Sequence, residues 1–251
     1  MTTRKDGRSS DAPRPITIET GFQRFPEGSV IYACGKTRVL ISASIEESVP
    51  KWMKGRNAGG WVTAEYEMHP RSNPQRQRRS RTRNNLDGRS SEIQRLIARS
   101  LRAAVDLKAL GDRMITVDCD VLDADGGTRT ASITGGFVAL AIAIDGLRKR
   151  GDVQPGVLRK EVAAISVGLV GGKHLVDLCY EEDRDAQVDL NVVATGPDEL
   201  VEVQGTAEGE PISKQDFDAL LDAGLGAIPT LVAKQREALE ACGVELSRLR
   251  A

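Results

Sequence analysis

A turn that combines two glycines, a threonine and an arginine is the first feature of this sequence that could do chemistry. It spans residues 125–130, between a segment that alternates like a strand and a long apolar segment typical of a buried helix. Glycine lets the backbone approach a ligand closely, and N–H groups at a helix start point towards an anion. The pattern therefore predicts a phosphate site formed by Gly127, Thr128 and Arg129. Arg89, at the start of another predicted helix, would close this site from a second direction. The alternative is an ordinary turn between a strand and a helix.

A cluster of acidic residues is the second such feature. Six acids fall within 13 residues: Asp177, Glu181, Glu182, Asp183, Asp185 and Asp189. If a tight turn separates Asp183 from Asp189, both carboxylates can face one point. Hard oxygen ligands with few protein contacts suit a Mg²⁺ ion that also holds a substrate phosphate, so these two acids are candidate metal ligands and catalytic groups. A solvated acidic hairpin is the alternative.

Anion-binding arginines and metal-binding carboxylates together favour phosphoryl chemistry on a nucleic acid. The sequence has no GxxxxGK[ST] pattern, which excludes a P-loop nucleotidase at the level of motifs. Neither His69 nor His174 lies near a serine or cysteine that it could activate, and we expect His174 to be structural. The attacking group is therefore expected to come from solution.

The elements of the first half must position the glycine turn. Strands are predicted from about residue 29 to 49, over 61–68 and over 114–121, with helices from about 90 to 107 and from about 130 to 150. Residues 1–15 form a polar, basic arm. Residues 69–87 have no apolar side chain before Leu86 and carry two prolines, which predicts a long loop.

The second half repeats the alternation of strands and helices. Strands are predicted over 163–172, 174–181, 186–195 and 200–209, followed by a helix over 214–241 that Gly224, Gly226 and Pro229 could kink or divide. No internal repeat is visible. The fold class is therefore mixed α/β, a single domain over residues 1–251 built from two layered units.

The distribution of charge indicates a phosphate-rich partner. Residues 69–102 contain ten arginines, no lysine and two acids, whereas the whole chain has a net charge of −1. A planar guanidinium grips phosphate oxygens with two parallel hydrogen bonds. The candidate RNA-binding residues of the loop are Arg76, Arg78, Arg79, Arg81 and Arg83. A solvated charged surface is the alternative. No aromatic residue lies between positions 68 and 137, so we expect backbone contact rather than base stacking.

Composition excludes several classes of protein. With 251 residues, 40% hydrophobic and 28% charged, the chain is globular rather than disordered or fibrous. No apolar run approaches the roughly 20 residues of a membrane helix, and the start of the chain does not look like a signal peptide, so a cytoplasmic protein without a membrane partner is expected. The four cysteines are scattered singly, which predicts buried free thiols rather than disulfides or a zinc site.

Several long strings closely resemble the bacterial ribonuclease PH family. They are RKDGR, EGSVIYACGKTRVLISASIEESVPKW, GWVTAEYEMHPR, GRSSEIQRLIARSLRAAVDL, ITVDCDVLDADGGTRTASITGG, VDLNVVATG and EVQGTAEG. The resemblance covers nearly the whole chain. It implies a phosphate-dependent 3′-to-5′ exoribonuclease that trims tRNA precursors, releases nucleoside 5′-diphosphates and can add nucleotides in reverse. It also implies two similar βαβα units packed together, and a ring, commonly a hexamer made of three dimers.

The resemblance carries over to particular residues. It implies that Arg89, Gly127, Thr128 and Arg129 bind inorganic phosphate, and that Asp183 and Asp189 are the paired acids credited with metal binding and catalysis. The chain departs from the family pattern in three places. Arg184 stands where a serine is usual, His69 replaces an apolar residue, and the loop is richer in arginine.

Two other functions remain open at this stage. One is a catalytically idle RNA-binding subunit of a ring, because a fold can persist after activity is lost. The other is a metal-dependent hydrolase that uses water. RNA with an unpaired 3′ end, incubated with and without phosphate, distinguishes the three by the products released.

Overall fold

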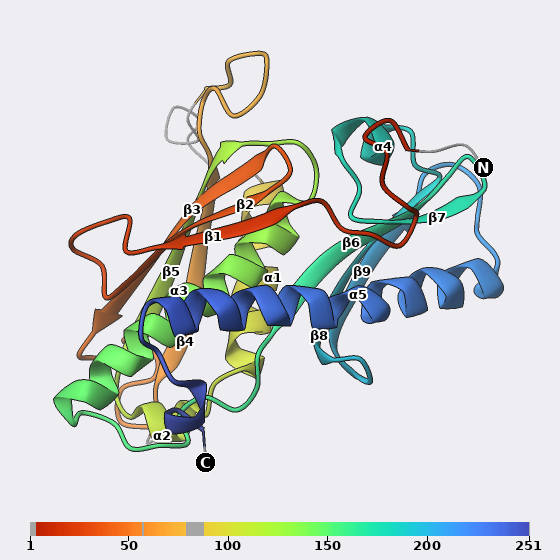
Figure 1. Ribbon diagram of the computed structural model, residues 1–251. Coiled ribbons are helices and arrows are strands. Elements are labelled where there is room, and N and C mark those ends of the chain that lie inside the picture. Colours follow the sequence, from red (N-terminus) through yellow and green to blue (C-terminus); the bar gives the residue numbers. More distant parts are fainter. Residues whose placement is uncertain (1–3, 57, 79–87, 251) are drawn as a thin grey trace.

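The computed structural model describes residues 4–56, 58–78 and 88–250, and it contains two β-sheets set beside each other (Figure 1). The first sheet has the strand order β1-β2-β3-β5-β4. Its strands are β1 (Ile16–Thr20), β2 (Gly28–Cys34), β3 (Thr37–Glu46), β4 (Trp61–Met68) and β5 (Met114–Asp123). Neighbouring strands are antiparallel except β4 and β5, which are parallel. A parallel pair needs a crossover, which helix α1 (Gly88–Ala103) supplies.

Two helices bury one face of the first sheet. Helix α1 packs against β4, and helix α3 (Thr128–Arg150) packs against β2 and β3. The strands alternate, so residues such as Val39, Ile41 and Ala43 point to the helices and are fully buried. The other face carries charged residues. The sheet therefore has one apolar and one wet side, as antiparallel sheets commonly do.

Helix α3 is mostly apolar between Ala131 and Ile144, where protein surrounds it, and it is charged at both ends. By length and composition it is the one helix, among those the structure describes, that could cross a membrane, with a mean hydropathy of 1.6 over an 18-residue window. Of that window, 89% is buried inside the protein, against the first sheet, β6, α1 and α5. The expectation that no apolar run approaches membrane length is thus corrected, and burial between two sheets explains the composition.

The second sheet is antiparallel with the order β7-β6-β8-β9. Its strands are β6 (Ala163–Val170), β7 (Lys173–Val176), β8 (Val188–Gly196) and β9 (Glu199–Ala207). Between β7 and β8 lies the short helix α4 (Tyr180–Arg184), and after β9 comes α5 (Lys214–Ala241). A short 3₁₀ turn, Leu246–Arg248, follows near the end of the chain. The mixed α/β architecture of two units is confirmed.

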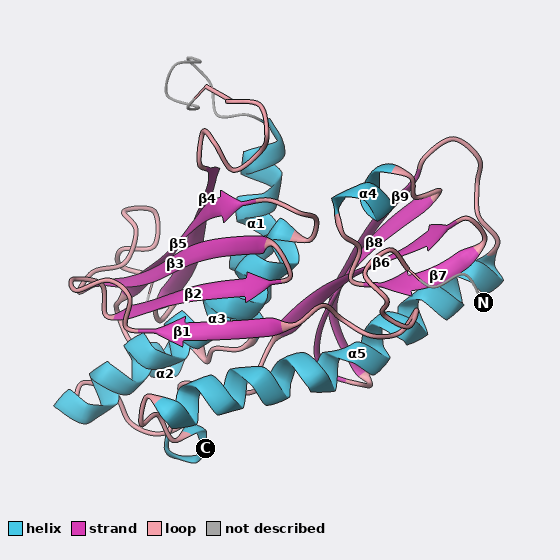
Figure 2. Cartoon of the chain, turned by 45° about the horizontal axis from the view of Figure 1, so that its top comes forward, coloured by secondary structure: helices cyan, strands magenta, loops and turns pink. Residues whose placement is uncertain are grey.

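Helix α5 connects the two units. Figure 2 shows it running along both sheets, and it contacts β6, β7 and β8 of the second unit and β1 of the first. Pro229 and the glycines do not divide it. Gly224 instead allows close packing, because a Cβ there would lie 2.8 Å from Cγ2 of Val192 on β8. Ser213 caps the start of the helix by accepting a hydrogen bond from the Asp216 backbone N–H at 3.0 Å.

Three local predictions were wrong. The helix expected from about 90 to 107 ends at Ala103, and Asp106 caps a separate short helix, α2 (Leu107–Leu110). The strand expected over 174–181 stops at Val176, because Asp177 has a positive φ of 56° and α4 follows. Of the four free thiols, Cys34 and Cys119 are buried, but Cys179 is half-buried and Cys242 is exposed. Both of the latter are helix-cap positions near the surface.

His174 contacts Asp216 of α5 at 3.0 Å, as expected of a structural residue.

Candidate active site

The glycine turn lies at the junction of the two units. Gly126 and Gly127 have φ values of 80° and 66°, in the left-handed region that favours glycine, and Gly127 is the N-cap of α3. A Cβ on Gly126 would lie 2.4 Å from the carbonyl oxygen of Leu178 in the second unit. The turn therefore has no room for a side chain on that side. Its other face, with Thr128 at the first turn of α3, opens into a pocket.

Hydrogen bonds from the first sheet fix the turn. The Thr37 hydroxyl donates to the Gly126 carbonyl at 2.7 Å and accepts from the Asp125 backbone N–H at 2.9 Å. On the pocket side, the hydroxyls of Tyr66 and Thr128 lie 2.8 Å apart. Burial raises the pKa of Tyr66, so its hydroxyl stays protonated and available to donate. The start of α3 is thus held from β3 and β4.

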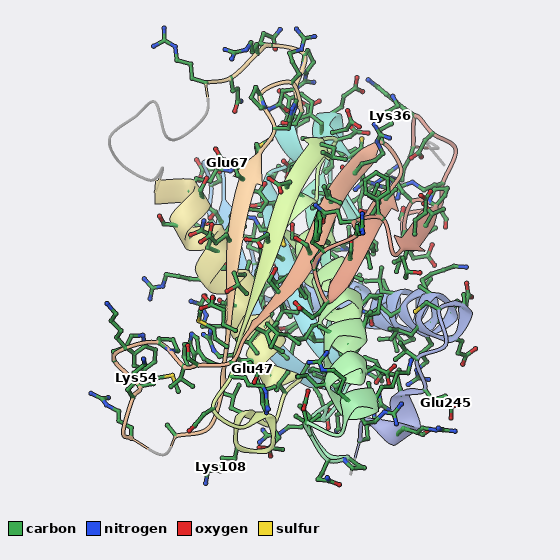
Figure 3. The ribbon with its side chains drawn as sticks, turned by 90° about the vertical axis from the view of Figure 1, so that its left-hand side faces the viewer. Lys36, Glu47, Lys54, Glu67, Lys108 and Glu245 are labelled. Atoms are coloured by element: carbon green, nitrogen blue, oxygen red, sulfur yellow. The ribbon has the colours of Figure 1, made fainter. Side chains whose placement is uncertain are left out.

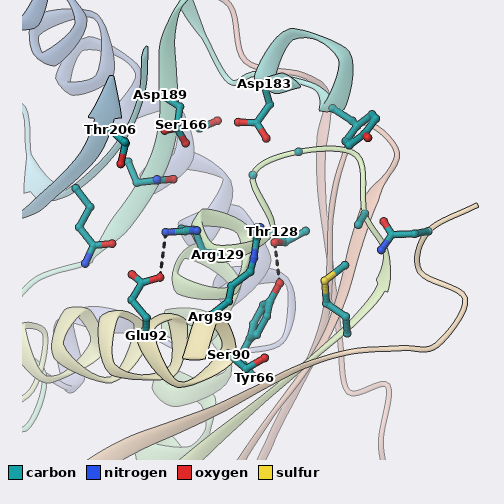
Figure 4. Close-up of a pocket in the computed structure, with 18 of the residues that line it drawn as sticks. Tyr66, Arg89, Ser90, Glu92, Thr128, Arg129, Ser166, Asp183, Asp189 and Thr206 are labelled. Atoms are coloured by element: carbon teal, nitrogen blue, oxygen red, sulfur yellow. Dashed lines mark hydrogen bonds and ion pairs between the residues drawn. The ribbon is translucent and has the colours of Figure 1, made fainter. Parts of the chain in front are cut away.

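Two arginines enter the pocket from different helices. Arg89 is the second residue of α1, and Arg129 is the second residue of α3. The close-up in Figure 4 shows both side chains beside Thr128, below the two acidic residues. Nη1 of Arg129 lies 3.5 Å from Oε2 of Glu92, a long contact on the exposed side. Two guanidinium groups and a helix N-terminus together make a strongly anion-binding wall.

Asp183 and Asp189 face these arginines from the second unit. Asp183 is the fourth residue of α4, and Asp189 is the second residue of β8. Burial raises the pKa of Asp183, and the nearby Arg89 and Arg129 oppose that rise. Burial and the charge of Asp183 both raise the pKa of Asp189. Two carboxylates that repel each other next to two arginines form a site with opposite charges at close range, a pattern common in active sites.

The short helix α4 orients Asp183. Its N-cap is Cys179, whose backbone N–H donates to Oε2 of Glu182 at 3.0 Å, as in a capping box. Arg184 binds the neighbouring Asp185 at 2.7 Å on the exposed surface. The turn after Asp183 is closed by the Ala186 N–H, which donates to the Asp183 carbonyl at 3.3 Å. Arg184 therefore leaves the orientation of Asp183 to the backbone.

The pocket has a volume of about 1450 Å³ and is lined by both units. Pockets for small molecules commonly measure roughly 300–1,000 Å³, so this one has room for the end of a polymer. It brings together all the sequence-predicted site residues that the structure describes: Arg76, Arg78, Arg89, Gly127, Thr128, Arg129, Asp183 and Asp189. Arg79, Arg81 and Arg83 lie outside the described residues.

The pocket opens at one end of the first sheet. Figure 3 shows Glu67, a pocket-lining residue near the end of β4, at one end of the sheet. Glu47, Lys54 and Lys108 lie at the opposite end. The residues from His69 to Arg78 continue from the Glu67 end. The arginine-rich segment therefore begins beside the pocket rather than on a distant surface.

The sequence did not reveal several polar residues of the pocket wall. They are Tyr66, Ser90, Ser166, Tyr180, Asn191, Gln204 and Thr206. Strand alternation could have indicated Asn191, which lies two residues after Asp189 on β8 and so shares its face. Ser166, opposite Asn191 on β6, follows only from the register. Nothing in the local sequence marks Tyr66 or Tyr180.

The donor set fits a hard divalent cation held by few protein ligands. Within the part of the chain that the structure describes, no group of three or more His, Cys, Asp or Glu side chains could hold a metal ion. Asp183 and Asp189 nevertheless lie close enough for the charge of one to raise the pKa of the other. One or two carboxylates, with water and substrate phosphate completing the shell, is the usual arrangement for Mg²⁺.

Comparison with known proteins gives one consistent family. Residues 12–144 match the model of the "3' exoribonuclease family, domain 1", and residues 160–227 match domain 2 of the same family. The chain is 53% identical over 241 residues to the ribonuclease PH of Mycobacterium avium, covering 96% of this chain and 93% of that protein. It is 50% identical over 242 residues to the ribonuclease PH of Mycolicibacterium smegmatis, with the same coverages.

Solved structures share the fold at lower sequence identity. The crystal structure of rice Rrp46 has a TM-score of 0.75 at 18% identity, covering 94% of this chain and all of that one. A chain of the Archaeoglobus fulgidus exosome, solved with RNA bound to the active site, has a TM-score of 0.74 at 24% identity, covering 93% and 92%.

Proposed function

Because the chain belongs to the 3′ exoribonuclease family, we propose that it is a phosphate-dependent 3′-to-5′ exoribonuclease that processes tRNA precursors. It releases nucleoside 5′-diphosphates and adds nucleotides in the reverse direction. The observation that carries this proposal is the meeting of Arg89, Arg129 and Asp183 in one pocket formed by both units. The pocket's size and its arginine-rich entrance suit the end of an RNA strand.

Inorganic phosphate is the co-substrate in this proposal. Arg89 and Arg129 clamp it, and the backbone N–H groups at Gly127 and Thr128 together with the Thr128 hydroxyl complete its site. An oxygen of the bound phosphate attacks the phosphorus of the last phosphodiester, and the bond from that phosphorus to the 3′ oxygen breaks. The departing 3′ oxygen takes up a proton. Positioning and charge stabilisation are the main contributions of the protein to such a transfer.

Asp183 and Asp189 are the proposed catalytic carboxylates. They would hold Mg²⁺, which supplies neutralisation of the charge that develops on the phosphate oxygens. Asp189 is half-buried, which strengthens its interaction with a cation because charges interact more strongly away from water, whereas Asp183 is exposed. Arg89 and Arg129 offset the negative charge of the two carboxylates. The inorganic phosphate and the last phosphodiester of the RNA can therefore both enter the pocket.

The proposed RNA path runs from the arginine-rich segment into the pocket. Arg76 and Arg78 line the pocket, and we assign the same role to Arg79, Arg81 and Arg83 beyond them. Contacts of this kind bind the backbone and depend little on sequence. The substrate is RNA with a single-stranded 3′ end.

We also propose the assembly and location that the sequence predicted. The two units form a single domain over residues 1–251, with the basic arm 1–15 and the arginine-rich loop 69–87. The protein forms a ring, a hexamer made of three dimers, in the cytoplasm. Similarity to the fold of exosome subunits supports a ring, and light scattering of the purified protein would give the number of subunits.

The decisive experiment is an RNA with an unpaired 3′ end, incubated with Mg²⁺ in the presence and absence of phosphate. Nucleoside diphosphates that form only with phosphate are the expected products. Nucleoside monophosphates formed without phosphate would indicate a hydrolase and contradict the proposal. A protein that binds the RNA but releases nothing would be an idle subunit.

A further inference from the structure

The segment from Arg4 to Arg14 is bound into the second unit rather than extended into solvent. Arg4 is 9% exposed, and its guanidinium donates to the carbonyls of Val176 at 2.7 Å and Asp177 at 2.9 Å. Its Nε also donates to Oε1 of Glu182, the residue before Asp183, at 2.7 Å. Arg4 is thus already hydrogen-bonded to protein groups, and it contacts helix α4, which carries Asp183.

Arg14 makes the most extensive of these contacts and reaches both sides of the pocket. Its backbone N–H and its Nε donate to Oδ2 of Asp177 at 2.7 Å and 2.8 Å, and its Nη2 donates to Oδ1 at 2.7 Å. Nη2 also donates to the Gly126 carbonyl at 3.3 Å, and Nη1 donates to the Asp125 carbonyl. One guanidinium thereby binds the glycine turn of the first unit and the acidic segment of the second.

The ion pair between Arg14 and Asp177 is buried, and Arg14 donates hydrogen bonds to both oxygens of the Asp177 carboxylate. Each side chain is only 5% exposed. Burial alone would raise the pKa of Asp177, but the hydrogen bonds and charge of Arg14 outweigh it and hold the pKa below its usual value. Asp177 also has a positive φ, which ends β7 and turns the chain towards α4. The planar fork of an arginine fits such two-point contacts, whereas a lysine ammonium does not.

We propose that Arg14 is a positioning residue that sets the separation between the phosphate-binding turn and the carboxylate-bearing segment. It does not touch the phosphate in this proposal. It acts through the carbonyls of Asp125 and Gly126 on one side and through Asp177 on the other. The inference rests on the proposed function, because it assumes that phosphate binds at the glycine turn.

The test replaces Arg14 with lysine, which keeps a positive charge next to Asp177 but loses the fork. We expect the KM for phosphate to rise at least tenfold in Arg14→Lys, while RNA affinity measured without phosphate changes less than twofold. Phosphate should also raise the melting temperature of Arg14→Lys less than that of the unmodified protein, a measurement that needs no catalysis. The matched control is Arg148→Lys, because Arg148 pairs with the buried Asp145 near the far end of α3.

A purely structural role would lower the melting temperature and the active fraction but leave the KM for phosphate of the remaining molecules unchanged. That result would overturn the inference. Should Arg14→Lys fail to fold, Asp177→Asn gives the same test. This change keeps the shape of the side chain but removes its charge, which weakens its hydrogen bonds with Arg14. An unchanged KM for phosphate in Asp177→Asn also refutes the proposal. If the unmodified protein shows neither phosphate-dependent cleavage nor stabilisation by phosphate, the proposed function itself fails, and this inference with it.

Discussion

Replacing Arg129 with alanine should separate phosphate binding from RNA binding. Arg129 lies at the start of α3, inside the pocket, with its side chain 21% exposed. In the proposed mechanism its guanidinium binds the attacking phosphate and stabilises the negative charge that grows on the phosphate oxygens during transfer. The loss of one such donor costs about 2.7–4 kcal/mol in the barrier, or roughly a 10²- to 10³-fold fall in rate.

The same change should have little effect on stability. The contact from Arg129 to Glu92 is 3.5 Å long, and the Glu92 side chain is 45% exposed. Exposed ion pairs of this kind contribute about 0–1 kcal/mol. The expected loss of activity therefore exceeds the expected loss of stability by a wide margin, and this difference identifies the residue as part of the site.

The assay measures kcat/KM for phosphate by release of nucleoside diphosphate from an RNA with an unpaired 3′ end, together with RNA affinity and the melting temperature. Arg148→Ala is the control, because it removes an arginine from the other end of the same helix and leaves Lys149 to pair with Asp145. If Arg129→Ala loses RNA affinity as much as it loses activity, Arg129 binds RNA instead. A loss of activity below about tenfold would refute the clamp.

Three further outcomes follow from the same pocket. In the double variant Arg76→Gln and Arg78→Gln, RNA binding should weaken. The slope of log affinity against log salt, measured by salt titration, should flatten by about 0.7 for each lost phosphate contact. An unchanged slope would mean that these arginines form a solvated surface and do not bind RNA. Asp189→Asn should abolish activity yet raise the melting temperature at neutral pH, because the raised pKa of Asp189 means that its ionised form destabilises the folded state. That gain in melting temperature should shrink as the pH falls through the folded-state pKa towards the usual value of 3.8, and a gain independent of pH would contradict this explanation. Gly126→Ala should lower the melting temperature sharply, because its Cβ would lie 2.4 Å from a backbone oxygen. The control Gly146→Ala would meet only a flexible side-chain atom at 3.8 Å and should stabilise α3 by roughly 0.5–1 kcal/mol. Equal effects of the two changes would argue against a tight junction between the units.

Periodicity alone predicted most elements of the fold. The helix over 214–241 matches α5, and the strand over 61–68 matches β4, because long regular patterns leave little ambiguity. Errors occurred where a single residue overrides the pattern. Asp177 adopts a positive φ and ends a strand whose apolar alternation continues in the sequence, and Asp106 caps a new short helix where the apolar spacing continues.

The candidate site was predictable in its charged residues and in the glycine turn that contains Gly127 and Thr128. Arg89, Arg129, Asp183 and Asp189 stand out by type and spacing, but their meeting in one pocket depends on how the two units pack. Tyr66 could not be foreseen, since its contact with Thr128 joins β4 to α3 across 62 positions of the chain. The role of Arg14 was hidden for the same reason, and by composition it belonged to a basic arm.

The pairing of Arg14 with Asp177 joins residues 163 positions apart. Contacts between such distant residues form late, because a long loop must close before they contribute any stability. During translation the amino-terminal strands emerge before the second unit has been synthesised, so the glycine turn of the proposed phosphate site lacks its partner until that unit emerges. The two sides of the pocket can therefore meet only after the segment that carries Asp177, Asp183 and Asp189 has been synthesised.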